Sequence, residues 1–227
     1  METLKAVLKT LLFPFFLAGV CLAMSIIPCA DLLPMALAAG GENLGHVSRI
    51  QGVVFAQQGR DLRPLALHAA VQRQDILKTG PGARLELTML DETRLALGAD
   101  TALALERYDL GRQQGAGAVL LRLGRGAVRV ATGDLSALRG GPFEVATPFG
   151  AIGLRGTEFW AGYLSAEELS VLLISGQGVH LKNDAGRTEI VKPLEGVTLR
   201  SLDAPPPAPT LWSPAKRAAA FKTVAFD

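Results

Sequence analysis

Residues 143–160 read FEVATPFGAIGLRGTEFW, with short apolar runs separated by turn residues. The runs Phe143–Ala146 and Ala151–Leu154 have the length and composition of β-strands. Between them stands Thr147-Pro148-Phe149-Gly150, in which proline presets φ and glycine accepts a positive φ, as a β-turn requires. Arg155-Gly156-Thr157 then supplies a second bend before another apolar run. The segment therefore predicts strands connected by two tight turns.

The same pattern of short apolar runs between turn residues extends from His46 to about Leu199. There, runs of Val, Leu, Ile and Phe are separated by Gly, Asp and Asn. Arg84–Leu90 and Thr93–Leu97 alternate polar and apolar residues, so each is expected to place one face on a core and one in water. The polar pair Asp91-Glu92 between them suits a hairpin, although it lacks the glycine typical of such turns. The body of the chain is expected to be all-β.

Three segments share a weak internal similarity, in which an apolar residue and a glycine-containing turn precede alternating apolar positions. They are Ile50–Phe55, Leu123–Val130 and Ile174–Leu181. Repeated strand-turn-strand units can stack as a solenoid or pair across a sandwich. The spacing of the three copies leaves both arrangements open.

The first residues are expected to form an export leader. Two lysines, Lys5 and Lys9, precede the apolar run Leu11–Ile27, and small residues follow around Ala38. This is the order of a signal peptide, and cleavage after Ala38 is predicted. The apolar run is shorter than the roughly 20 residues that a spanning helix needs, and Pro14 interrupts it. If the leader were retained instead, it would tether the domain to the outer side of the inner membrane.

Residues 1–38 are thus assigned to the signal peptide, 44–200 to a β domain, and 201–227 to a Pro-rich linker and short tail. Leader cleavage removes both cysteines, so the mature chain could form no disulfide and its core must hold it together. Proline-rich residues 204–209 predict a stiff spacer. The tail after it could dock on its own domain, be partly disordered or bind a partner, and Ser213-Pro214 could start a short helix.

The sequence lacks the usual signs of catalysis or nucleic-acid binding. A net charge of +2, with arginines spread singly along strands, argues against a nucleic-acid binder. The three histidines have no metal-ligand spacing, and neither a nucleophile elbow nor a phosphate-binding loop is present. Paired carboxylates such as Asp91 and Glu92 are interpreted as turn residues. We expect no enzyme activity, cofactor or metal site.

The sequence resembles the FecR domain family, whose hallmark is an apolar-x-Thr-Pro segment followed closely by Arg-Gly-Thr-Glu-Phe. The resemblance covers residues 46–185, and Val171–Val179 looks like the family's closing strand pair. Gln74 and Glu92 depart from the pattern, because glycine is common at both positions. The matching motif residues, for which a structural role is expected, are Asp75, Thr79, Thr147, Pro148, Arg155, Gly156, Thr157, Glu158 and Phe159. Of these, Arg155, Thr157 and Glu158 are expected to form a hydrogen-bonded corner.

The resemblance implies FecR-like stacked β-strands and a non-enzymatic signalling or interaction module that is periplasmic or secreted. The best-known members relay a receptor's state to a sigma factor through a cytoplasmic domain. Only ten residues precede Leu11, so no direct sigma-factor contact is expected.

Two binding functions remain open. An unidentified envelope protein could bind by strand addition at an exposed edge, or through a loop. Alternatively, Trp160 and Tyr163 could stack on an envelope glycan or peptidoglycan if they are exposed, whereas a Trp160 within the core would remove the leading residue of that hypothesis.

Overall fold

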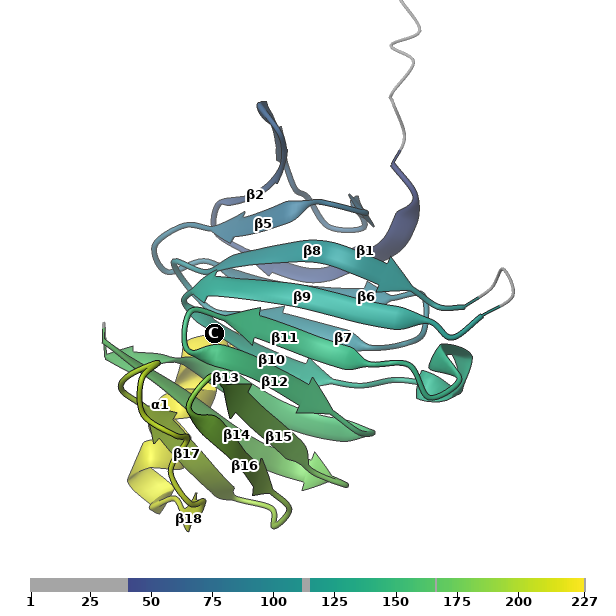
Figure 1. Cartoon of the computed structure of the whole chain (residues 1–227). Coiled ribbons are helices and arrows are strands. Elements are labelled where there is room, and N and C mark those ends of the chain that lie inside the picture. Colours follow the sequence, from purple (N-terminus) through teal and green to yellow (C-terminus); the bar gives the residue numbers. More distant parts are fainter. Residues whose placement is uncertain (1–40, 112–114, 166, 227) are drawn as a thin grey trace, which may run out of the picture. The chain divides into compact units, whose positions relative to one another are not determined.

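The structure, a computed structural model, describes residues 41–111, 115–165 and 167–226, which belong to one compact unit (Figure 1). The expected leader lies outside the described residues, and its cleavage stays a prediction. Within the described ranges, no helix has the length and apolar character that crossing a lipid bilayer requires.

The described chain is mostly strand and forms two nine-stranded sheets. From edge to edge, sheet A contains β18 (Thr210–Leu211), β17 (Glu195–Leu199), β14 (Glu168–Gly176), β13 (Thr157–Ser165), β10 (Ala127–Ala131), β7 (Arg94–Leu97), β6 (Arg84–Met89), β1 (Asn43–Gln51) and β4 (Ala70–Gln72). Sheet B contains β16 (Gly186–Ile190), β15 (Val179–Asn183), β12 (Gly150–Leu154), β11 (Phe143–Thr147), β9 (Ala118–Arg125), β8 (Ala102–Asp109), β5 (Ile76–Thr79), β2 (Val54–Gln58) and β3 (Asp61–Pro64). A 3₁₀ turn, η1 (Leu135–Leu138), and one α-helix, α1 (Pro214–Val224), complete the fold.

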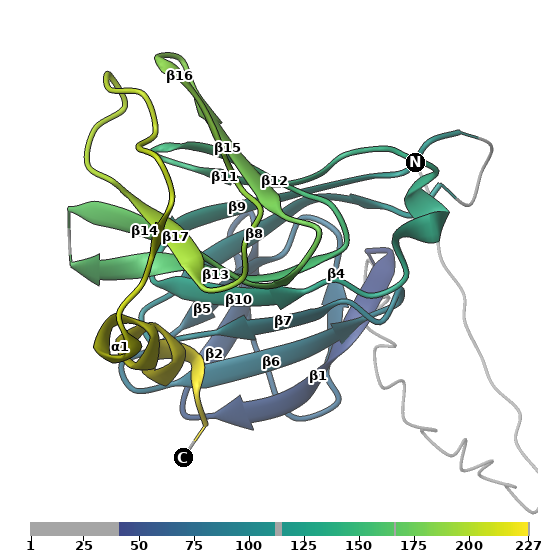
Figure 2. The ribbon, with the colours of Figure 1, turned by 90° about the horizontal axis from the view of Figure 1, so that it is seen from below.

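The prediction of an all-β body is confirmed, and the two alternating runs form the expected hairpin. Along β6 and β7 every second residue is buried, because a strand points successive side chains to opposite faces. The polar pair Asp91-Glu92 lies in the loop between these strands. Buried leucines of both sheets, such as Leu87 on β6 and Leu121 on β9, belong to one hydrophobic core. Figure 2 shows this layering most clearly where β15, β11 and β9 of sheet B lie above β13, β10 and β7 of sheet A.

The fold combines features of the two arrangements that the sequence left open. Both sheets cover a common core, as in a sandwich. The chain passes repeatedly between the sheets, and each sheet adds its strands in chain order, as in a solenoid. The exceptions are the first strands, because β4 lies outside β1 in sheet A and β3 lies outside β2 in sheet B. Most neighbouring strands are antiparallel, and β9 with β11 forms a parallel pair.

The three similar segments are places where the chain crosses between sheets. They contain the connections from β1 to β2, from β9 to β10 and from β14 to β15. Each crossing has a glycine with positive φ, namely Gly52 at 73°, Gly126 at 83° and Gly176 at 103°. A side chain at Gly126 would also collide with the backbone of Thr101. The internal similarity therefore reflects a recurring glycine-containing connection between the two sheets.

The two departures from the family pattern adopt the backbone conformation that glycine favours. Gln74 has a φ of 67° and Glu92 a φ of 65°, and both are exposed. A left-handed conformation costs an L-residue roughly 1–2 kcal/mol, whereas glycine adopts it without that cost. We expect Gln74→Gly and Glu92→Gly each to raise the free energy of unfolding by up to about 1 kcal/mol, because the extra freedom of the unfolded glycine offsets part of the gain.

Urea unfolding of the two variants would measure this effect. Thr88→Gly on β6 is the matched control, and it should lower stability because glycine weakens an ordinary strand. If Gln74→Gly and Glu92→Gly were destabilising like the control, backbone strain at these turns would be refuted.

The C-terminal tail docks on the outer face of sheet A, so the folded unit extends beyond the boundary at residue 200 drawn from the sequence. Helix α1 begins as Ser213-Pro214 predicted, with the Ser213 side chain accepting a hydrogen bond from the Lys216 backbone. Trp212 of the tail and Trp160 of β13 belong to a second apolar cluster, separate from the core between the sheets. Figure 2 shows α1 on the side of sheet A that faces away from sheet B.

Candidate functional site

The Thr147-Pro148 motif forms the turn between β11 and β12. Thr147 is largely buried, and its hydroxyl donates to the Gly150 carbonyl at 2.7 Å and accepts from the Phe149 backbone N–H at 3.1 Å. Pro148 is exposed on the turn, and Gly150 has a φ of 127°. The strands and turn predicted for residues 143–154 are therefore present, and Thr147 fixes the turn with its own side chain.

Asp75 immediately precedes β5 and Thr79 ends it, and both are buried. The Asp75 carboxylate accepts hydrogen bonds from the Gln72 backbone N–H and from Arg63 on β3, each at 2.8 Å. The Thr79 hydroxyl donates to the Gly98 carbonyl at 2.6 Å. These two residues thus connect β5 to neighbouring segments, at a distance in sequence from the Arg-Gly-Thr-Glu-Phe motif.

Arg155 and Gly156 form the exposed crossing from β12 to β13, and buried Thr157 begins β13. Gly156 has a φ of 54°. The Thr157 hydroxyl lies 2.8 Å from the carbonyl oxygens of both Arg155 and Gly178, and it accepts from the Gly178 backbone N–H at 3.3 Å. The Thr157 backbone N–H also donates to the Thr132 hydroxyl at 2.9 Å. Thr157 therefore joins this crossing to the one from β14 to β15.

Glu158 and Phe159 point to opposite faces of sheet A, as neighbours in a strand must. The Glu158 carboxylate accepts from Arg129 Nε at 2.9 Å, and Phe159 is fully buried in the main core. The Arg155 guanidinium, by contrast, makes no hydrogen bond or ion pair with any described residue. The expected hydrogen-bonded corner thus includes the side chains of Thr157 and Glu158 and leaves that of Arg155 available.

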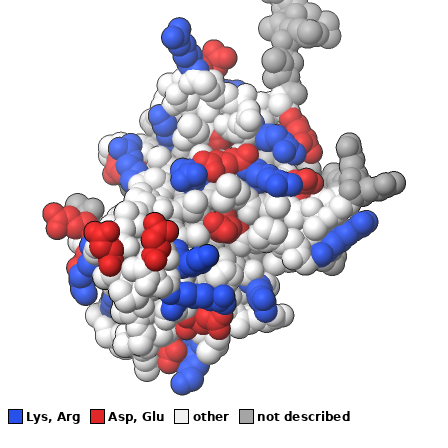
Figure 3. Space-filling model, viewed as in Figure 1, with Lys and Arg blue, Asp and Glu red and all other residues white. Residues whose placement is uncertain are grey.

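A groove of about 620 Å³ lies beside this crossing, and we call it the corner groove. Its apolar lining comes from Leu135, Leu138, Phe143 and Leu154, and its polar lining from Glu144, Arg155, Gln177 and His180. A smaller hollow of about 240 Å³ shares Arg155, Gln177 and His180 with it and reaches Arg187 and Glu189 on the edge strand β16. Figure 3, viewed toward sheet B as in Figure 1, shows basic and acidic side chains interspersed over this face.

His180 occupies its place in the groove because Gly153 has no side chain. The two residues are cross-strand partners on β15 and β12, and a Cβ at position 153 would overlap the imidazole ring. Partial burial lowers the pKa of His180, and the positive charges of Arg187 and Arg155 lower it further, against the opposing carboxylates of Glu189 and Glu144. The groove therefore favours a neutral imidazole, which can both donate and accept hydrogen bonds.

This lowered pKa predicts a pH dependence of stability. The unfolded chain takes up a proton at His180 at a higher pH than the folded chain does. The contribution of the neutral ring to the free energy of unfolding is therefore complete above about pH 6.5. It is lost as the pH falls from there through the folded-state pKa. We expect the free energy of unfolding, measured by urea titration at successive pH values, to decline more steeply below pH 6.5 in the native chain than in His180→Gln. Parallel profiles would contradict the assignment.

Sequence reasoning treated His180 only as a residue without metal-ligand spacing and did not place it in a groove. The isolated glycine at 153 was the available signal, because glycine inside a strand often marks a close approach of another group. Among the described residues, no group of three or more His, Cys, Asp and Glu side chains is arranged to hold a metal ion.

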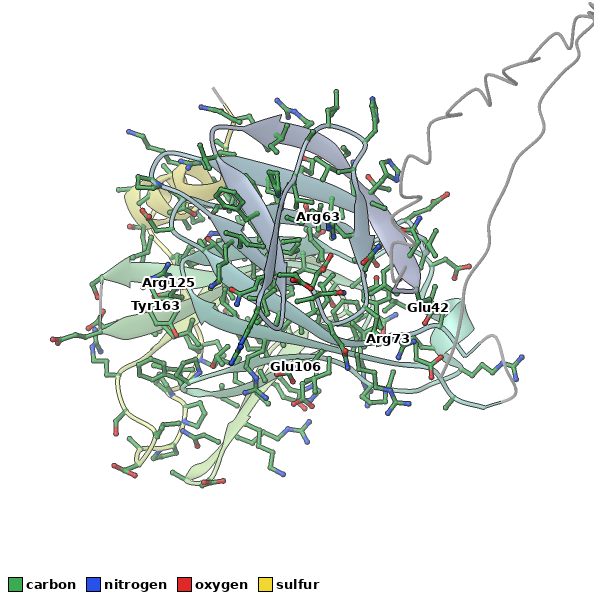
Figure 4. All side chains as sticks on the ribbon, turned by 90° about the horizontal axis from the view of Figure 1, so that it is seen from above. Glu42, Arg63, Arg73, Glu106, Arg125 and Tyr163 are labelled. Atoms are coloured by element: carbon green, nitrogen blue, oxygen red, sulfur yellow. The ribbon has the colours of Figure 1, made fainter. Side chains whose placement is uncertain are left out.

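A second cavity, of about 350 Å³, lies near Tyr108 and is lined in part by Glu42 and Arg73. These two side chains point toward each other in Figure 4 and form an ion pair at 2.6 Å. The charge of Arg73 is therefore already matched, in contrast to that of Arg155.

The two aromatic residues considered for sugar stacking are not presented to solvent as a platform. Trp160 is fully buried, and its indole N–H donates to the Thr223 hydroxyl of α1 at 2.9 Å. Tyr163 is half-buried against Phe149, and its hydroxyl is buried as well. The leading residue of the glycan hypothesis is thus a core residue.

The described fold resembles two crystal structures of a proposed anti-sigma factor from Parabacteroides distasonis ATCC 8503, solved at 2.50 Å and 1.65 Å resolution. The sequence identities are 17% and 19%, and the TM-scores are 0.50 and 0.49. Each match covers 63% of this chain and 62% of the other, so this chain spans less than two thirds of that protein's length. At this identity the first match shows a shared fold alone.

No curated protein matches the sequence. The FecR protein family, in contrast, matches residues 75–177, a range that includes all nine motif residues and much of the corner groove. Residues 75–177 of the chain are therefore identified by their match to the FecR protein family.

Proposed function

We propose that this protein is a signalling and interaction module of the cell envelope that binds a protein partner at the corner groove. The observation that carries the proposal is the exposed guanidinium of Arg155, which has no partner among the described residues and stands beside an apolar lining. An exposed arginine next to buried apolar surface is a common anchor of protein interfaces.

The local structure supports a recognition role for Arg155. Thr157 fixes the backbone of the crossing from inside, so the guanidinium stands on a preorganised turn. Preorganisation reduces the entropy that ordering a contact residue costs on binding. The neighbouring edge strand β16 has no outer strand partner among the described residues, so a partner that added a strand there would lie next to the groove.

The lining favours binding over catalysis. Glu144 is the single carboxylate among the residues that line the 620 Å³ groove, whereas a carboxylate-based hydrolase needs a converging pair. The family match points in the same direction, because FecR domains are regulatory modules. The basic, apolar and small order of residues 1–38 supports an envelope location.

Co-purification from envelope extracts would test the proposal. The full chain with Gln177→Trp, which fills the mouth of the groove from an exposed position, should lose a partner that the native chain retains. Arg60→Trp, at the exposed tip between β2 and β3, is the matched control and should retain it. If every protein retained by the native chain were retained equally by Gln177→Trp, the groove would not be the binding site.

A further inference from the structure

The corner groove also carries information about the chemistry of its occupant. Resting on the proposed function, we infer that the groove binds an extended peptide segment of the partner in which a side-chain carboxylate lies next to apolar side chains. The carboxylate pairs with Arg155. The apolar side chains lie against half-buried Leu135 and exposed Pro142, because the other apolar lining residues are buried in the core.

Charge pairing on this face distinguishes Arg155 from its neighbours. Arg122 pairs with Glu106, and Arg187 pairs with Glu189. Arg155 has no such partner among the described residues, and its planar guanidinium can bind a carboxylate through two parallel hydrogen bonds. Among the described residues, the groove lining therefore holds two unpaired charges, those of Arg155 and Glu144, and of these Arg155 is the one that can bind a carboxylate.

The remaining lining fits a peptide better than a compact anion. Leu135 and Pro142 supply accessible apolar surface in the groove, and 620 Å³ is room for several side chains. The Gln177 amide and the neutral His180 ring offer both donors and acceptors, which suits the main chain of an extended segment. Glu144 would disfavour a second carboxylate close to it, so the match is one carboxylate among apolar residues.

Fluorescence anisotropy with short labelled peptides tests this inference on the full chain. The probes are fluorescein-labelled Leu-Leu-Glu-Leu-Leu and its Leu-Leu-Gln-Leu-Leu counterpart, both with amidated C-termini, and the glutamine peptide with a free C-terminus. We expect the glutamate peptide to bind about ten-fold or more tightly than the amidated glutamine peptide, because a hydrogen bond to a charged group is involved. Arg155→Ala should abolish this preference.

Arg60→Ala removes another exposed arginine without a described partner, at the tip of the β2–β3 hairpin, and should leave the preference intact. The inference is overturned if no peptide binds, if glutamate and glutamine peptides bind equally, or if only the free C-terminus confers binding. It is also overturned if Arg60→Ala abolishes the preference as fully as Arg155→Ala does. Loss of the envelope partner in Gln177→Trp is a separate result, so the proposed function can survive while this inference fails.

Discussion

Trp212→Ala is expected to lower the free energy of unfolding by about 3–5 kcal/mol, the usual cost of removing a large buried aromatic side chain. Trp212 is 3% exposed, and its ring centroid lies 6.1 Å from that of Trp160 in an edge-to-face arrangement. The Lys216 ammonium lies 4.0 Å from the Trp212 ring centroid and donates to Thr198 on β17. Removing the indole would therefore undo much of the attachment of the tail to sheet A.

Chemical denaturation would give the stability change, and tryptophan fluorescence gives an independent readout. The chain has two tryptophans, so the emission of Trp212→Ala comes from Trp160 alone and should shift to the red as water reaches that ring. Leu211→Ala is the matched control, because Leu211 is adjacent in sequence but 70% exposed. An equal loss of stability in both variants would mean that Trp212 does not hold the tail in place.

Thr157→Val is expected to lower the free energy of unfolding by about 2–3 kcal/mol although it preserves the shape of the side chain. The change removes the hydroxyl that donates toward the carbonyls of Arg155 and Gly178 and accepts from the Gly178 N–H. These backbone groups then lose a buried partner, and an unsatisfied buried polar group costs more than the net gain of an ordinary hydrogen bond. The crossings on both sides should loosen together.

Thr157→Ser separates the hydroxyl from the methyl group. It retains the hydrogen bonds and should cost only about 1 kcal/mol, the value of one buried methyl. Thermal and urea unfolding of both variants would provide the comparison. If serine proved as destabilising as valine, packing of the methyl group, rather than the hydrogen bonds, would explain the role of Thr157.

Much of the local structure could be predicted from short-range patterns. The Thr147–Gly150 turn and the β6–β7 hairpin follow from residues whose backbone preferences act over four or five positions. The alternation along β6 likewise reveals which face is buried, because strand geometry alone fixes the period. These features require no knowledge of distant contacts.

The docking of the tail could not be predicted in the same way. Trp212 reaches its partner Trp160 across more than fifty residues of sequence, and the polyproline segment before it reads equally well as a spacer to a free tail. The buried hydrogen bond from Tyr108 to Asp91 has the same character, because Asp91 reads locally as an exposed turn residue. Long-range pairs of this kind decide burial but leave no periodic signal.

The candidate site was predicted in part. The motif identified Arg155, Thr157 and Glu158, but it did not reveal that their environments differ. In the structure Thr157 is buried at the start of β13, Glu158 pairs with Arg129, and Arg155 is exposed. The groove itself depends on η1 and on the pairing of Gly153 with His180 across two strands. Its composition therefore comes from segments that sequence proximity does not connect.

Site-specific photo-crosslinking in the envelope tests most directly whether the corner groove is the partner-binding site. A small aliphatic diazirine residue at Gln177, which unlike tryptophan leaves the groove open, should yield a discrete crosslinked species. Arg155→Ala in the same chain should reduce its yield about ten-fold or more, while its unfolding transition stays that of the native chain. The same probe at Arg60 should yield none of this species. A Gln177 crosslink that persists undiminished in Arg155→Ala, or that forms equally from Arg60, would contradict the account.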